Sequence, residues 1–178
     1  APLWTEKALP SQPGSTSGVG CFEYSQINSV TNRYYHANGD TIYGIVGTTV
    51  TKLANKGAVG DKTHRLRNLV INGTEYLMWC RSDAQYYCPG ASDPAVAASW
   101  VTTAVIGLAG TSVADVHQHP TLNTDFVRMT TVGAIDLPVA ATSPGQIDGG
   151  GHFLGIMAGI LYMISARGIL YSYDPTQA

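Results

Sequence analysis

The chain has 178 residues, of which 44% are hydrophobic and 12% are charged, whereas average globular chains carry about 25% charged residues. The formal net charge of −2 argues against nucleic acid as the main partner, because a phosphate-binding surface needs clustered Lys and Arg. No apolar run reaches the roughly 18 residues that a membrane-spanning helix needs. The low fraction of charged residues, together with 20 glycines, favours a β-rich protein whose neutral surface can be covered by neighbouring chains.

Residues 1–20 predict an extended N-terminal arm. Three prolines interrupt this segment, at Pro2, Pro10 and Pro13, and proline disfavours helix both at its own position and at the residue before it. The arm carries three apolar side chains that suit a protein interface better than a solvated tail, namely Leu3, Trp4 and Leu9. Two interpretations stay open: a disordered terminus, or an arm that binds a neighbouring subunit through these three residues.

Two segments predict short helices. Within Cys21–Tyr35, three apolar residues recur at helical spacing, which favours a short helix. Asp93-Pro94 has the composition of a helix N-terminus, so a second helix is expected over Ala95–Trp100.

The clearest local prediction is a tight hairpin at Asn72-Gly73, between the strands Leu66–Ile71 and Thr74–Trp79. Asn-Gly tolerates the positive φ angles of a type I′ turn, and this explains the residues better than a glycosylation site does. A second turn signal, Asn38-Gly39-Asp40, precedes two further expected strands, Thr41–Val46 and Thr48–Leu53.

From Val101 to Tyr173 the sequence predicts a series of short strands, because runs rich in Val, Ile, Thr and Phe alternate with Gly, Pro, Asn and Asp. Turns are expected at Ser143-Pro144-Gly145 and in the glycine-rich bend Asp148–Gly151. The expected strands are Phe126–Thr131, Ala134–Ala140, His152–Met157, Ile160–Ser165 and Ile169–Tyr173. We therefore predict an all-β fold, a mostly antiparallel β-barrel or sandwich with at most short helices, as one domain over residues 21–178.

The three cysteines are an odd number, so they cannot all form disulfides within one chain. Cys80 and Cys88 could meet across a hairpin, which would leave Cys21 over. The favoured interpretation is three reduced thiols that pack as small apolar groups, as expected of a protein assembled in a cytoplasm.

His117-Gln118-His119 is the segment most suggestive of a metal site, because alternate residues of a strand face the same side. The pattern loosely resembles the cupin family, which has a Gly, a His-x-His, a Glu and a second Gly, with a further His on a later strand. The matching residues are Gly110, His117, His119, Asp125, Gly133 and His152. Asp115 would face the same side. Two features depart from the family's pattern: the acidic residue is Asp rather than Glu, with a longer spacing, and Pro120 directly after His119 suits a strand end or a loop. We therefore predict that no metal and no other cofactor is bound.

Other catalytic signatures do not stand out. Asp148–Gly151 lacks the helix and the Lys-Ser/Thr of a nucleotide loop, and the sequence has no Gly-x-Ser-x-Gly elbow. We therefore predict a protein that is not an enzyme.

The order of motifs between Trp100 and Tyr162 resembles the small β-barrel decoration, or cement, proteins of tailed-phage heads. These proteins show a Val-x-Val-x-Thr-x-Gly strand, a Leu-Pro-Val/Ala strand and a loop that enters a Gly-Gly/Asp-x-Leu-Gly strand. The matching residues here are Phe126–Gly133, Ile135–Val139 and Gly150–Gly155, preceded by Val105–Ala109. The family usually has an Asp where Gly151 and His152 stand.

The resemblance implies a structural virion protein on the capsid surface, assembled in the host cytoplasm, which bridges major capsid subunits. Its expected partners are the major capsid protein and other copies of the chain, with a homo-oligomer such as a trimer, and neither nucleic acid nor membrane. Two alternatives remain: a receptor-binding domain of a phage tail fibre or spike, and a cupin-type metal enzyme that uses His117, His119 and His152.

Overall fold

The computed structural model describes residues 21–27, 30–46, 48–55, 62–102 and 112–177. Within these residues the fold is all-β and every strand pairing is antiparallel, which confirms the predicted fold class as a sandwich-like arrangement rather than a closed barrel. No helix in this part of the chain is long and apolar enough to cross a membrane.

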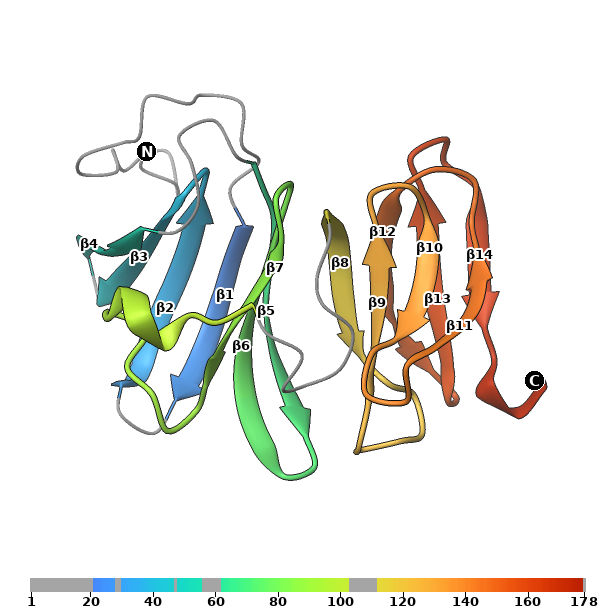
Figure 1. Ribbon diagram of the computed structural model, residues 1–178, viewed down its shortest axis with the longest axis horizontal. Helices are drawn as coiled ribbons and strands as arrows, with labels where there is room; N and C mark the ends of the chain where they lie inside the picture. The colour runs from blue at the N-terminus through green and yellow to red at the C-terminus, as the bar shows by residue number, and fades with distance from the viewer. Residues whose placement is uncertain (1–20, 28–29, 47, 56–61, 103–111, 178) are drawn as a thin grey trace, which may run out of the picture.

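Four sheets follow one another along the chain, each built by consecutive strands (Figure 1). The first contains β1 (Cys21–Ile27), β2 (Val30–Asn38), β3 (Thr41–Val46) and β4 (Thr49–Asn55), and the second contains β5 (Thr63–Ile71), β6 (Thr74–Arg81) and β7 (Gln85–Pro89). The third contains β8 (Val113–Gln118), β9 (Phe126–Thr130), β10 (Ala134–Leu137) and β11 (Thr142–Gln146), and the fourth contains β12 (Gly151–Met157), β13 (Ile160–Ser165) and β14 (Leu170–Tyr173).

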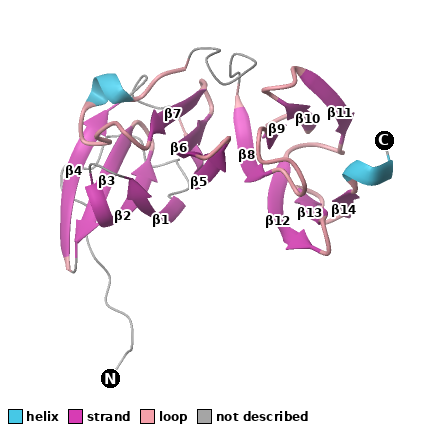
Figure 2. Ribbon diagram, turned by 90° about the horizontal axis from the view of Figure 1, so that it is seen from below, coloured by secondary structure: helices cyan, strands magenta, loops and turns pink. Residues whose placement is uncertain are grey.

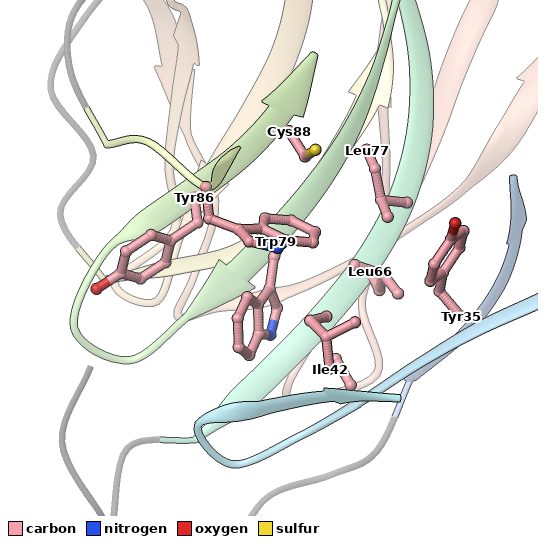
Figure 3. Close-up of a cluster of buried hydrophobic side chains, with 9 residues drawn as sticks. Tyr35, Ile42, Leu66, Leu77, Trp79, Tyr86 and Cys88 are labelled. Atoms are coloured by element: carbon pink, nitrogen blue, oxygen red, sulfur yellow. The ribbon is translucent and has the colours of Figure 1, made fainter. Parts of the chain in front are cut away.

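The sheets form two lobes, β1–β7 and β8–β14, which lie side by side (Figures 1 and 2). One apolar cluster, which includes Ile42, Leu66 and Trp79, fills the first lobe between β1–β4 and β5–β7 (Figure 3). Trp79 and Trp100 meet edge to face in it, with ring centroids 5.4 Å apart. A second cluster, which includes Met78, Val116 and Phe126, joins the two lobes. A third, which includes Met129, Phe153 and Met163, fills the second lobe.

Strand β6 is buried on both of its faces. Leu77 and Trp79 belong to the core of the first lobe, whereas Met78 and Cys80 belong to the cluster between the lobes. This explains why residues 76–80 of the strand are an unbroken apolar run rather than an alternating one. Cys88 lies opposite Leu77 in the register and therefore on the other face of the sheet from Cys80. The two cysteines are buried thiols that are not bonded to each other.

The predicted hairpin at Asn72-Gly73 is confirmed. Ile71 pairs with Thr74, and the two turn residues have φ angles of 50° and 76°, as a type I′ turn requires. The turn at Gly39 also forms, between β2 and β3. Strands β3 and β13 have the predicted bounds, and the other expected strands agree with the structure to within a few residues.

Three local predictions are wrong. The segment Cys21–Tyr35 forms β1 and part of β2 instead of a helix, because pairing with the neighbouring strands outweighs its weak helical periodicity. Ser143-Pro144-Gly145 is not a turn but lies within β11, at the edge of its sheet, where a proline without an N–H is tolerated.

The third error concerns Ala95–Trp100, which contains only a single 3₁₀ turn, η1 (Ala97–Ser99). The Asp93 Oδ1 accepts the Ala95 N–H at 2.8 Å, but the N-cap of η1 is Val96, which makes no side-chain cap hydrogen bond. The helix cannot continue because Trp100 enters the core and Val101 forms a bridge with Tyr87. A second 3₁₀ turn, η3 (Pro175–Gln177), lies near the C-terminus.

Several predictions lie outside the described residues. These are the N-terminal arm with its proposed contact residues Leu3, Trp4 and Leu9, the strand Val105–Ala109, and Gly110.

Candidate functional site

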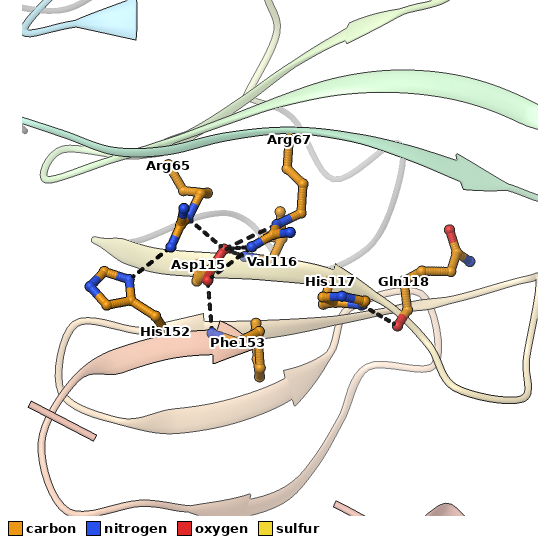
Figure 4. Close-up of polar contacts among 8 residues, drawn as sticks. All are labelled: Arg65, Arg67, Asp115, Val116, His117, Gln118, His152 and Phe153. Atoms are coloured by element: carbon orange, nitrogen blue, oxygen red, sulfur yellow. Dashed lines mark hydrogen bonds and ion pairs between the residues drawn. The ribbon is translucent and has the colours of Figure 1, made fainter. Parts of the chain in front are cut away.

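The most densely connected polar group in the described part of the chain centres on Asp115, a fully buried residue of β8 (Figure 4). Its carboxylate oxygens accept the backbone N–H groups of Val116 and Phe153, both at 2.8 Å. The guanidinium groups of Arg65 and Arg67, on β5, lie 3.4 Å from Oδ1. A buried carboxylate needs such charged and hydrogen-bonding partners, and here they come from both lobes. Asp115 therefore ties β5, β8 and β12 together.

His152 extends this cluster towards the surface. Its Nδ1 lies 3.2 Å from the Nη2 of Arg65, and arginine can only donate. His152 therefore accepts through Nδ1, which places the proton of the neutral ring on Nε2. The ring is exposed on β12, while the neighbouring Phe153 side chain points into the core of the lobe.

His117 is half-buried on β8, on the same face as Asp115. Its ring packs edge to face against Phe153, with centroids 6.3 Å apart, and its Nδ1 lies 3.1 Å from the carbonyl oxygen of Gln118. A carbonyl only accepts, so Nδ1 carries the proton. Burial lowers the pKa of His117, and the residue packs as a neutral aromatic group.

His119 lies beyond the end of β8, as expected from Pro120 after it. Its Nδ1 accepts the backbone N–H groups of Thr121 and Leu122 at 3.2 and 2.9 Å, and its Nε2 lies 3.4 Å from the Tyr173 hydroxyl. Burial lowers the pKa of this ring too. His119 thus holds the loop after β8 and joins it to β14.

Asp125 has a similar local role. Its buried carboxylate accepts the backbone N–H groups of Phe126, Val139 and Ala140, at 2.7 to 3.1 Å. These bonds fix the chain where β9 begins and where β10 has ended. A carboxylate with three backbone donors is well matched to that task.

The candidate ligands of the cupin-like pattern therefore have separate partners: His117 contacts Phe153, His119 contacts Tyr173, and His152 contacts Arg65. Within the residues that the structure describes, no group of three or more His, Cys, Asp or Glu side chains is arranged to hold a metal ion. The absence of a bound metal stays a prediction, for which metal analysis is the test.

The outer face of the β12–β14 sheet is an apolar surface that sequence reasoning missed. Three of its side chains are largely exposed: Leu154 (59%), Met157 (65%) and Leu170 (61%). The strand register places three half-buried β13 residues between them, namely Ile160, Tyr162 and Ile164. We call these six residues the apolar outer face. One sequence feature could have predicted this surface: β13, ILYMIS, is apolar at nearly every position, whereas a strand with one solvated face alternates.

A comparison of the sequence with models of known protein families finds no match, and a comparison with curated protein sequences finds no significant relative.

Proposed function

We propose that the chain is a structural protein of a tailed-phage head, which decorates the capsid and stabilises it by bridging major capsid subunits. The observation that carries this proposal is the apolar outer face. Singly exposed apolar residues are common on proteins, but a contiguous group on one sheet is typical of a surface that another chain covers. The low charge of the sequence is in keeping with such a surface.

The polar clusters support the same proposal. The buried carboxylates of Asp115 and Asp125 are occupied by backbone N–H groups, and Asp115 also has two arginines. His117 and His119 are held by local contacts as well. These groups stabilise the sandwich and its loops. A capsid-stabilising protein needs a rigid body that presents contact surfaces, and the all-β fold with these internal ties meets that need.

The test is attachment to heads of the phage that carries the gene. Leu154→Asp places a charge on the apolar outer face, and we expect it to weaken attachment about tenfold or more, because one buried leucine contributes about 1.5–3 kcal/mol. Val132→Asp is the matched control, since Val132 is 67% exposed and lies between β9 and β10, which belong to the third sheet and not to the β12–β14 sheet. Co-sedimentation of the labelled variants with heads measures both affinities, and equal attachment of the two variants would contradict the proposal.

The copy number of the chain in purified particles, measured by quantitative mass spectrometry, tests the alternatives. Hundreds of copies per particle are expected for a decoration protein, and a handful would favour a tail fibre or spike. Stoichiometric metal in the isolated protein, lost on His117→Ala, would favour the cupin-type enzyme.

A further inference from the structure

The sandwich of the second lobe has one closed edge and one open edge. At the closed edge, β8 and β12 are joined by the Asp115 carboxylate, which accepts the Phe153 N–H. At the other edge, β11 and β14 are the outermost strands of their sheets, and among the residues that the structure describes each pairs with a single neighbouring strand. Both views place these two strands at the end of the molecule farthest from β1–β4 (Figures 1 and 2).

A groove runs between β11 and β14. Its deeper part is a cavity of about 160 Å³ with an apolar floor made by Ile135, Ile147 and Met163, and with Tyr171 and Tyr173 along one wall. A shallower hollow of about 470 Å³ continues it past Pro144 to Asp174 and Gln177. The three floor residues belong to the core of the lobe and are at most 6% exposed. The groove therefore reaches the hydrophobic core from outside.

The two walls favour an extended occupant. Strand β14 pairs with β13 along one edge, and no other described strand pairs with the edge beside the groove. Such an edge can pair with an extended peptide. Strand β11 is exposed along its whole length, and Pro144 and Gly145 leave its edge with few donors and little side-chain bulk. A segment that pairs with β14 and inserts an apolar side chain over Met163 would fit both walls.

We propose that the groove binds the N-terminal arm, residues 1–20, of a second copy of the chain, with Trp4 in the cavity. The arm sequence has the required chemistry, because Leu3, Trp4 and Leu9 are apolar and its three prolines disfavour a helix. Fully extended, its 20 residues span at most about 70 Å. The arm leads into β1, in the opposite lobe from the groove (Figure 1), so a neighbouring copy can offer its arm without wrapping it around both lobes.

This inference rests on the proposed function and deepens it, because an arm passed from copy to copy would link decoration subunits laterally. It concerns a different surface, however, since the apolar outer face is the proposed contact with the capsid. The groove lies at the sheet edge instead, so variants can separate the two contacts.

Gly145 gives a direct way to fill the groove. A Cβ built on it meets no atom within 4 Å, and its register partner is Ile135, which lies on the floor. Gly145→Leu should therefore place its side chain in the groove without a clash. Gly155→Leu is the matched control, because its Cβ also meets nothing within 4 Å and its partner Tyr162 lies on the outer face.

The experiment measures binding of a fluorescent peptide of residues 1–13 to the full chain carrying Trp4→Ala, whose own arm cannot compete strongly. Fluorescence anisotropy should show saturable binding, unchanged by a further Gly155→Leu and weakened about tenfold or more by a further Gly145→Leu, as for a hot-spot residue. A peptide with Trp4→Ala should bind at least about tenfold more weakly. Absence of saturable binding, or equal binding to the Gly145→Leu and Gly155→Leu proteins, would overturn the proposal.

A photo-reactive benzophenone at position 4 then identifies the chain that supplies the arm. In an equimolar mixture of ¹⁴N- and ¹⁵N-labelled full-length protein, we expect cross-links between light and heavy peptides that contain β11 or β14. Cross-links confined to chains of one isotope, or to other strands, would overturn the assignment to a second copy. Loss of capsid attachment by Leu154→Asp without any arm binding would leave the proposed function standing and overturn only the groove.

Discussion

The buried carboxylate of Asp115 offers a sharp test of how the two lobes are held together. In Asp115→Asn, one carboxylate oxygen becomes an NH₂ group that donates towards existing donors: two backbone N–H groups and the guanidinium groups of Arg65 and Arg67. Removing one partner of a buried ion pair typically costs about 3–5 kcal/mol. We therefore expect the free energy of unfolding to fall by about that amount.

Asp148→Asn is the matched control, because Asp148 forms a shorter ion pair with Arg167, 2.8 Å from its Nη1. Both of those side chains are largely exposed, and exposed pairs contribute about 0–1 kcal/mol. Burial, and not distance, should decide the difference between the two variants.

Urea denaturation followed by tryptophan fluorescence measures both variants. In a thermal melt of a chain of this size, a loss of about 3–5 kcal/mol corresponds to a fall in Tm of about 6–20 °C, whereas the Tm of the Asp148→Asn control should fall by at most a few degrees. If Asp115→Asn and Asp148→Asn lose stability equally, the assigned role of the buried cluster is wrong.

Three further predictions concern single residues. Gly133 has a φ of +88°, and a Cβ there would overlap the backbone carbonyl oxygens of Ile147 and Gly149. Gly133→Ala should therefore lower the urea midpoint more than Gly73→Ala, where φ is +76° but the space is open. Burial raises the pKa of the Cys88 thiol to about 12, so iodoacetamide at pH 8 should modify it only in urea, as peptide mass mapping will show; labelling in the native protein would contradict this. Burial lowers the pKa of His119 from 6.5, so the unfolded chain binds more protons than the folded chain below about pH 6.5. The contribution of His119 to the free energy of unfolding should therefore be complete above that pH and decline as the pH falls. Urea midpoints measured against pH should show a smaller decline for His119→Asn.

The sequence was most informative where a few adjacent residues decide the structure. Asn72-Gly73 determines its hairpin because only a few residue types tolerate two successive positive φ angles. Strand β13 was found because turn residues bound it on both sides. Pro120 correctly placed His119 beyond the end of its strand.

The errors arose where distant contacts decide. The helix expected over Cys21–Tyr35 loses to strand partners that periodicity cannot see. Asp115 meets Arg67 across 48 positions of sequence, and no local motif announces that pairing. Similarly, β11 is a strand only because β10 offers it a partner, and the groove beside it depends on how two sheets stack.

The β5–β7 sheet separates two hydrophobic clusters and packs against both, with the Cys88 thiol on one face and the Cys80 thiol on the other. If this sheet separates from either neighbour, it exposes one thiol and leaves the other covered. The opening of each core can therefore be followed by the rate at which its cysteine is labelled at low urea concentrations, below the unfolding midpoint. Because unfolding of the β5–β7 sheet would expose both clusters, we expect the labelling rates of Cys80 and Cys88 to converge as the urea concentration rises. The two lobes should then unfold as one cooperative unit.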